Sequence, residues 1–283
     1  MNGLWSDPLK SAHQLFHEEG ILIYPQVFEG EALERLRQAC ETVLDRYLAD
    51  LDVTDPGSKN TVVMRHLNDP RWHPVDKTDW KVLMETIADP RCLGPVEQIF
   101  RGESLFFCTS FLFNPRFESF EGNWHRDIQF TLKDEERVKE IMPEPDTSGI
   151  QFQIALIDND DLEYVPFSAS RYDSPEEYYI RCADDRKHSC EAGMPNAMRI
   201  RLQAGDAVAF NPKGLHRGRY YRDNPRRTLL LTYTPRTMEV ANYFSHQPWM
   251  EEESYLSCLS PRARAYFDDF IRAYAESWKT AAS

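Results

Sequence analysis

The sequence predicts a mainly β protein, a barrel or jelly roll, with helices flanking the β core at both ends. Short strand-like segments separated by turn residues fill the middle of the chain, and few helical patterns are interleaved with them. Helical patterns are concentrated instead near the two ends of the chain. A parallel α/β sheet would need a helix between successive strands, so this order favours an antiparallel β core.

The N-terminal part begins with the apolar, strand-like run GILIYPQVF at residues 20–28. Residues 29–51 are then predicted to form a helix. Their apolar residues recur at helical spacing, namely Leu33, Leu36, Cys40, Leu44 and Leu48. Residues 79–102 are predicted to form two shorter helices that break at Pro90, because proline interrupts a helix.

The β core is predicted to start with SLFFCTSFLFNPR at residues 104–116, which is rich in aromatic and β-forming residues. Further strand signals lie at residues 149–157, 161–167, 197–202, 206–211 and 227–234. A last helix is expected from Ser260-Pro261 to about Ser277, with serine as the N-cap and proline at the first helical position.

Two longer polar segments, residues 131–149 and 168–196, interrupt the predicted strands. Loops of this length beside a rigid β scaffold often form lids or substrate-binding segments. Ordinary surface excursions would have the same composition, so for each segment alone both interpretations stay open. The charged segment from Thr131 to Gly149 directly follows the first motif described below, and we expect it to be the lid.

The charge and composition exclude several classes of protein. The chain has 33 Lys and Arg against 46 Asp and Glu, a net charge of −13, whereas a general nucleic-acid binder needs a basic surface. No apolar run approaches the roughly 20 residues of a membrane span, and the N-terminus lacks the pattern of a secretory leader. Because the six cysteines show no repeated spacing, we expect free thiols and a cytoplasmic protein. A zinc site from Cys182, His188 and Cys190 is a minor alternative, since no CxxC pair is present.

The first informative motif is NWHRDIQF at residues 123–130, where His125 and Asp127 are separated by one residue. The stretch resembles the end of a β-strand, and side chains at i and i+2 of a strand point to the same face. The pair could bind a metal, act as an acid–base pair, or form a buried ion pair.

The second motif is AGDAVAFNPKGLHRGRYYRDNPRRTLLLTYTPR at residues 204–236, which contains His216. His125, Asp127 and His216 would give two imidazoles and one carboxylate, with adjacent coordination positions left open. This is the ligand set of non-haem Fe(II) oxygenases. An arginine at the start of the following strand would supply the bidentate cation that a dicarboxylate co-substrate requires.

With these motifs the chain resembles the phytanoyl-CoA dioxygenase family, Fe(II)- and 2-oxoglutarate-dependent enzymes built on a double-stranded β-helix, a cupin-like jelly roll. GILIYPQVFEGEALERLR resembles the family's N-terminal strand and helix, and NWHRD its metal pair. AGDAVAFNPKGLHRG…RRT resembles the segment with the distal histidine and the co-substrate arginine. The resemblance implies one dioxygenase domain over residues 1–283, with helical support at 1–103, the β core at 104–236 and a helical segment at 237–283.

The resemblance also implies roles for individual residues. His125, Asp127 and His216 would bind Fe(II). Arg227, eleven residues after His216, would bind the C5 carboxylate of 2-oxoglutarate, and its neighbour Arg226 would be a solvated charge. Two weaker assignments place Ser110 and Gln153 beside the co-substrate. The cofactors implied are Fe(II), 2-oxoglutarate and O₂.

Two positions depart from the family's pattern. The usual Pro-Gly-Ser-His is Pro166-Phe167-Ser168-Ala169 here, so the glycine and histidine of that turn are lost. The second residue after the distal histidine, often one with a small hydroxyl, is Gly218. A hydrogen bond to the co-substrate is therefore lost or replaced.

The predicted function is oxidation of an unactivated C–H bond of a small organic molecule or secondary metabolite, with hydroxylation as the default. Asp127 argues against a halogenase, because related halogenases carry a small residue there. A peptide hydroxylase, a non-catalytic 2-oxoglutarate-binding regulator and a cupin-type isomerase are the alternatives. We expect a small-molecule substrate and no nucleic-acid or membrane partner, with a homodimer as the oligomeric state to be tested.

Overall fold

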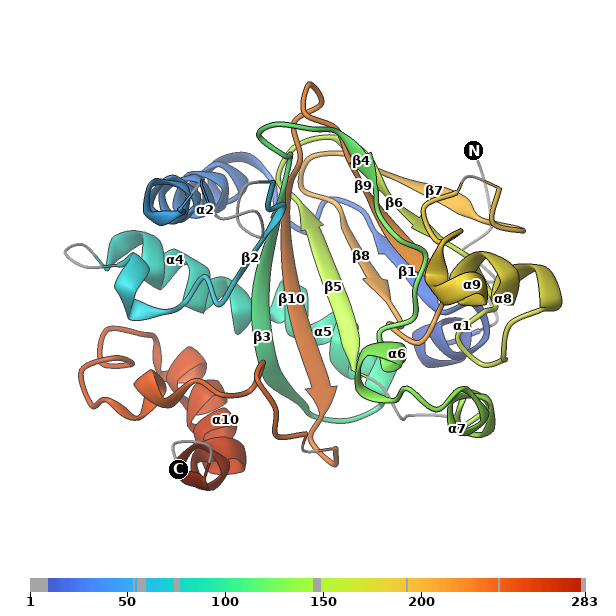
Figure 1. Ribbon diagram of the computed structural model, residues 1–283. Helices are drawn as coiled ribbons and strands as arrows, with labels where there is room; N and C mark the ends of the chain where they lie inside the picture. The colour runs from blue at the N-terminus through green and yellow to red at the C-terminus, as the bar shows by residue number, and fades with distance from the viewer. Residues whose placement is uncertain are drawn as a thin grey trace.

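The computed structural model describes residues 10–52, 54, 60–73, 77–144, 149–191, 193–238 and 240–280 (Figure 1). Two antiparallel sheets form the centre of the molecule. The six-stranded sheet has the order β1-β8-β5-β10-β3-β2, and the four-stranded sheet has the order β4-β9-β6-β7. The strands are β1 (Ile21–Tyr24), β2 (Val63–Arg65), β3 (Ser104–Phe113), β4 (Phe120–Glu121), β5 (Ile150–Ala155), β6 (Asn159–Tyr164), β7 (Met198–Leu202), β8 (Ala207–Phe210), β9 (His216–Tyr220) and β10 (Arg227–Pro235).

Successive strands of the β core alternate between the two sheets. β5 lies in the large sheet, β6 and β7 in the small one, β8 in the large, β9 in the small and β10 in the large. Every strand pairing is antiparallel. Winding the chain between two facing antiparallel sheets gives a jelly roll, which confirms the predicted double-stranded β-helix.

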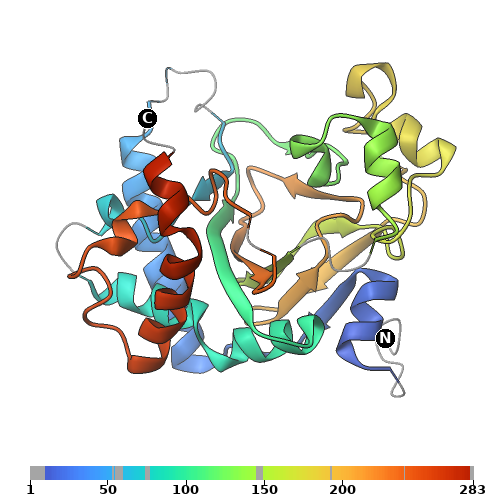
Figure 2. The same cartoon turned by 90° about the horizontal axis from the view of Figure 1, so that it is seen from below.

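The expected helices are also present. They are α2 (Gly30–Asp50), α4 (Thr78–Ile87), α5 (Pro90–Phe100) and α10 (Pro261–Thr280). The break at Pro90 is confirmed, since Asp89 caps α5 by accepting a hydrogen bond from the Arg91 amide and Pro90 takes the first helical position. Seen from below, α2, α4 and α10 pack on one side of the β core, and the short helices of the two polar insertions lie on the other (Figure 2).

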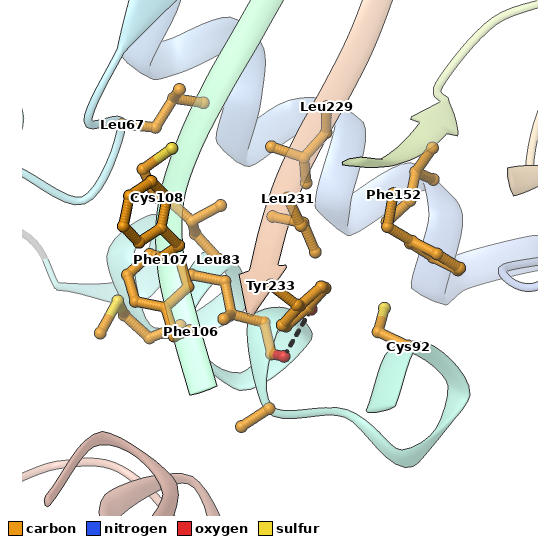
Figure 3. Close-up of a cluster of buried hydrophobic side chains, with 14 of the residues drawn as sticks. Leu67, Leu83, Cys92, Phe106, Phe107, Cys108, Phe152, Leu229, Leu231 and Tyr233 are labelled. Atoms are coloured by element: carbon orange, nitrogen blue, oxygen red, sulfur yellow. Dashed lines mark hydrogen bonds between the residues drawn. The ribbon is translucent and has the colours of Figure 1, made fainter. Parts of the chain in front are cut away.

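One face of the large sheet packs against these helices. Leu229, Leu231 and Tyr233 of β10 point into a buried apolar cluster with residues from β3, β5, α4 and α5, and the Tyr233 hydroxyl donates to the Ile87 carbonyl at 2.8 Å (Figure 3). Because side chains alternate along a strand, Leu230 and Thr232 face the interior between the sheets. This alternation decides which side chains can reach the site.

The two polar insertions contain short helices that were not predicted. The first holds α6 (Ile128–Thr131) and α7 (Glu135–Ile141); residues 145–148 of the predicted lid lie outside the described residues. The second holds α8 (Pro175–Arg181) and α9 (Ala183–Arg186). An additional helix, α1 (Ala12–Glu19), precedes β1, and two 3-10 turns, η1 (Pro70–Trp72) and η2 (Pro248–Glu251), connect other elements. Within the described part of the chain, no helix is both long and apolar enough to cross a membrane.

Candidate metal and co-substrate site

His125, Asp127 and His216 converge at one end of the β core. The Asp127 Oδ1 atom lies 3.4 Å from His125 Nε2 and 3.6 Å from His216 Nε2, and the two imidazole centroids are 4.3 Å apart. Within the described ranges, no other group of three or more His, Cys, Asp or Glu side chains brings its ligand atoms so close together. The described residues therefore do not form the alternative zinc site of Cys182, His188 and Cys190, and the cysteines are free thiols.

The backbone of this motif is not the strand end that the sequence suggested. His125 forms a single antiparallel bridge with His216, through their mutual amide–carbonyl hydrogen bonds of 3.1 and 3.0 Å. Asp127 already has helical torsion angles, with φ −60° and ψ −31°, and precedes α6. The prediction of a strand was wrong, but the bridge and the following helical turn still direct both side chains toward His216.

Both imidazoles present an unprotonated Nε2 atom to Asp127. His125 Nδ1 lies 2.7 Å from the Asn123 carbonyl and His216 Nδ1 lies 2.9 Å from the Gly214 carbonyl. A carbonyl only accepts hydrogen bonds, so each Nδ1 must carry the proton and the neutral ring has its lone pair on Nε2. Burial, followed by the nearby His125, lowers the pKa of His216 to about 4, which keeps this ring neutral near pH 7.

The carboxylate of Asp127 is held by Gln151, whose Nε2 atom donates to Asp127 Oδ2 at 2.5 Å. Burial raises the pKa of Asp127, but the neighbouring His125, His216 and Arg65 lower it below its ordinary value on balance. Two nitrogen lone pairs therefore face an oxygen of an ionised carboxylate. These atoms repel one another unless a cation lies between them. Adjacent ligands with bonds of about 2.1 Å would lie about 3 Å apart, so the donor set suits a bound metal ion.

Arg126, between two of these residues, points away from them into a buried ion network. Its guanidinium is fully buried and donates to Asp173 at 2.7 and 2.9 Å and to the carbonyls of Ser168 and Lys213. Asp173 also accepts from Arg181 at 2.5 Å, and Arg181 pairs with Glu135 of α7. Arg126 therefore has a structural role. The network joins the segment with His125 and Asp127 to both polar insertions.

In the turn that departs from the family's pattern, Ser168 holds the backbone through two hydrogen bonds. Ser168 Oγ donates to the Val165 carbonyl at 2.6 Å and accepts from the Leu215 amide at 2.8 Å, one residue before His216. Phe167 takes a left-handed conformation, with φ +63°, where glycine would be unstrained. The Phe167 side chain is 51% exposed, so the replacement is accommodated at the surface.

The environments of Arg227 and Arg226 are the reverse of those predicted. Arg227 has the same orientation on β10 as Leu229 and Leu231, and its guanidinium forms an ion pair with Glu41 of α2 and donates to Asn114 at 2.8 Å. Arg226 is only 2% exposed, so the prediction that it is a solvated charge was wrong. The turn between β9 and β10 breaks the two-residue alternation, so counting from His216 could not show which arginine faces inward.

Arg226 lies beside the strand that carries His216. A Cβ atom on Gly218 would be 2.9 Å from Arg226 Nη1 and 2.6 Å from the Tyr220 hydroxyl. Gly218 is two residues from His216 on β9, so the guanidinium lies roughly 7 Å further along the strand, given a rise of about 3.3 Å per residue. The space that a small hydroxyl side chain would fill at position 218 is occupied by Tyr220.

The hydrogen-bonding capacity of Arg226 is largely unused. Its guanidinium stacks on Tyr220 with 4.9 Å between the carbon atom and the ring centroid, and Nη1 makes one long bond of 3.4 Å to the Arg219 carbonyl. Asp161, also 2% exposed, is 3.9 Å away, beyond hydrogen-bonding distance, and Arg226 Nε has no partner among the described residues. Burial raises the pKa of Asp161, and Arg226 opposes that effect. A buried guanidinium with unused N–H donors can bind a carboxylate.

Ser110 and Gln153 occupy one transverse row on the interior face of the large sheet. Ser110 of β3 pairs with Leu230 of β10, and Leu230 pairs with Gln153 of β5. Both polar residues are buried, and Gln151 of the neighbouring row holds Asp127. The sequence analysis missed Gln151, although its spacing of two from Gln153 on a predicted strand places both on one face.

Comparison with known proteins agrees with this geometry. The family model of phytanoyl-CoA dioxygenase matches residues 16–228. The chain belongs to this family. It is a non-haem iron, 2-oxoglutarate-dependent dioxygenase. No curated protein sequence matches the chain significantly.

Solved structures share the fold at low sequence identity. AviO1 from Streptomyces viridochromogenes is 15% identical, with a TM-score of 0.57 over 85% of this chain and 100% of AviO1. EctD from S. alaskensis, crystallised with 2-oxoglutarate and 5-hydroxyectoine, is 16% identical, with a TM-score of 0.58 over 86% and 83% of the two chains. The carbocyclase SnoK from nogalamycin biosynthesis is 17% identical, with a TM-score of 0.56 over 83% and 87%.

Proposed function

We propose that His125, Asp127 and His216 hold Fe(II) and that the enzyme hydroxylates a C–H bond of a small organic molecule. The observation that supports this most directly is the convergence of two neutral Nε2 atoms on one carboxylate oxygen, at 3.4 and 3.6 Å, with no hydrogen-bond donor between them. When bound, Fe(II) with 2-oxoglutarate and O₂ supplies the oxidant, and 2-oxoglutarate leaves as succinate and CO₂. Localisation and oligomeric state stay predictions.

The protein's own residues position the reactants. The carbonyls of Asn123 and Gly214 keep the imidazoles in the tautomer that binds metal, and Gln151 fixes the orientation of Asp127. These contacts leave the side of the triad that faces the interior of the β core available to ligands.

For 2-oxoglutarate, the geometry supports Arg226 better than the predicted Arg227. Arg226 is buried on the interior side, roughly 7 Å from His216 along β9, and its donors are underused. A co-substrate that chelates the metal through its C1 carboxylate and ketone would extend its C5 carboxylate in this direction. The Tyr220 hydroxyl, beside Gly218, replaces the small hydroxyl that this position usually carries.

The choice of reaction depends on the substrate. EctD and SnoK have the same fold, and SnoK is a carbocyclase. Asp127 keeps a carboxylate at the metal, which supports oxygenation over halogenation. Hydroxylation is the proposed outcome, and a mass increase of one oxygen atom in the product would identify it.

The metal assignment is tested by Asp127→Ala, with Asp134→Ala as the matched control. Asp134 is a carboxylate that caps α7 through the amides of Glu136 and Arg137, away from the triad. We expect Asp127→Ala to abolish Fe(II)-dependent succinate formation from 2-oxoglutarate and the visible absorption bands of bound Co(II), while Asp134→Ala retains both. Wild-type turnover or Co(II) spectra in Asp127→Ala would show that Asp127 does not bind the metal.

A further inference from the structure

Arg65 projects into the interior of the β core from the edge strand β2. Arg65 pairs with Ser110 of β3, and paired residues of neighbouring strands point to the same face. The next residue toward the N-terminus, Met64, is fully buried on the opposite face. Arg65 Nη1 lies 3.4 Å from the interior hydroxyl of Ser110, which confirms the inward direction of the guanidinium.

This guanidinium lies on the same face of the large sheet as the residue that holds Asp127. Ser110 is followed on the same face of β3 by Cys108, whose partner Thr232 pairs in turn with Gln151, the residue that holds Asp127. Burial raises the pKa of Cys108 to about 11, and the positive charge of Arg65 opposes that rise.

Within the described part of the chain, Arg65 forms no ion pair, unlike the three arginines named next. Arg217 pairs with Glu163, Arg126 with Asp173, and Arg226 lies near Asp161. Among the residues that the structure describes, Arg65 contacts the Ser110 hydroxyl and the ring of Phe244, whose centroid is 4.7 Å from the guanidinium carbon. In a chain with a net charge of −13, an exposed guanidinium without a carboxylate is available to an external anion.

Aromatic side chains surround Arg65 on the side away from the sheet. The segment with Tyr243 and Phe244 contributes a ring under the guanidinium and a tyrosine that is 64% exposed. His66 packs edge-on against Tyr243 at 5.2 Å. Although His66 is 95% buried (5% exposed), neither of its ring nitrogens has a hydrogen-bond partner within the described ranges. A cation beside exposed aromatic rings suits an organic acid with an apolar or aromatic body.

We propose that Arg65 binds a carboxylate of the organic substrate and that Phe244 and Tyr243 pack against the body of the same molecule. This inference rests on the proposed function. Arg226 lies on a different segment, beside β9 and directly before β10, and is assigned the distal carboxylate of 2-oxoglutarate. The substrate class is therefore a small carboxylic acid with an apolar portion, oriented by its acid group so that a carbon atom lies beside the metal.

The test compares carboxylic acids with their neutral amides. Phenylacetate, 3-phenylpropionate and octanoate, each with its primary amide, are titrated against iron-free protein and followed by thermal shift and tryptophan fluorescence. We expect at least one acid to bind more tightly than its amide. Arg65→Gln should weaken that acid about 10- to 150-fold and leave the amide unchanged, since hydrogen bonds to charged groups contribute about 1.5–3 kcal/mol and 1.4 kcal/mol is tenfold.

Arg71→Gln is the matched control, because Arg71 is a nearby arginine that pairs with Asp69 outside the interior. It should bind the acids like wild type. Equal binding of acids and amides by wild type, or no binding of any acid, overturns the proposal. A 2-oxoglutarate affinity that falls more than the acid affinity in Arg65→Gln also overturns it and assigns Arg65 to the co-substrate. If the wild-type protein forms no succinate from 2-oxoglutarate in the absence of substrate, the proposed function is refuted instead.

Discussion

Substitutions of the adjacent residues Arg226 and Arg227 should have different effects on 2-oxoglutarate binding. Arg226→Lys keeps a positive charge beside the buried Asp161 but removes the planar fork that binds a carboxylate through two parallel hydrogen bonds. Removing Arg226 altogether would leave Asp161 without a compensating charge and would confuse binding with folding. Lysine therefore isolates the geometric contribution of the guanidinium.

The magnitude follows from the environment of each residue. Arg226 is 2% exposed and its spare donors face the interior, so losing one charge-assisted hydrogen bond should cost about 1.5–3 kcal/mol, roughly 10- to 150-fold in Kd. Arg227 forms a partly exposed pair with Glu41, with side chains that are 23% and 31% exposed. Such a pair contributes about 0–1 kcal/mol of stability, so Arg227→Gln should change unfolding slightly and binding hardly at all.

The assay is calorimetric titration of 2-oxoglutarate into Co(II)-loaded protein without O₂, combined with urea unfolding of each variant. Arg226→Lys should bind 2-oxoglutarate more weakly at nearly unchanged stability. If Arg227→Gln weakens 2-oxoglutarate more than Arg226→Lys does, the interior assignment of Arg226 is refuted and the assignment based on sequence spacing is restored.

Two further predictions concern stability. Arg126→Met should lower the free energy of unfolding by about 3–5 kcal/mol in urea titrations, because Asp173 loses a fully buried partner. The same variant should bind Co(II) more weakly. A loss of stability below about 1 kcal/mol would contradict the role of the ion network. Burial lowers the pKa of His66 in the folded protein to about 4, whereas the ordinary value in the unfolded chain is 6.5. Between pH 6.5 and 4 the unfolded chain therefore binds more protons than the folded protein, so stability is lost as the pH falls through this range. Between pH 7 and 5 this loss is about 2 kcal/mol, and His66→Leu should remove it in urea titrations; an unchanged pH dependence would refute the cause.

The strands and long helices were predictable because their signals are local. β3 and β10 are apolar, β-branched or aromatic runs, and α2 has apolar residues at helical spacing. One missed element also had a readable signal. Ser174-Pro175 with Glu177 forms a capping box with proline at the first turn of α8, a pattern that marks a helix start.

The convergence of the three candidate side chains was predictable, but their surroundings were not. The order of His125, Asp127 and His216 identified the triad, but the direction of Arg226 depends on the turn before β10. The pairing of Arg126 with Asp173 joins residues 47 positions apart in sequence, through an insertion with no periodic pattern. Short-range patterns carry no information on such contacts. The direction of Arg226 and the partner of Arg126 therefore could not be predicted without the fold.

Arginines around the β core differ both in burial and in how much of their hydrogen-bonding capacity the protein uses, since Arg126 and Arg226 are buried and Arg65 is exposed. Arg126 is saturated by a carboxylate and two carbonyls, and a saturated guanidinium can only hold structure. Arg226 has one long bond and a distant acid, and Arg65 has one long bond and a ring. Buried donors without acceptors, such as Arg226 Nε, are costly unless something satisfies them, whereas the exposed Arg65 is hydrated until an anion replaces the water. These two arginines belong to different segments, Arg65 to β2 and Arg226 to the turn before β10, as expected for an enzyme that binds two carboxylates together.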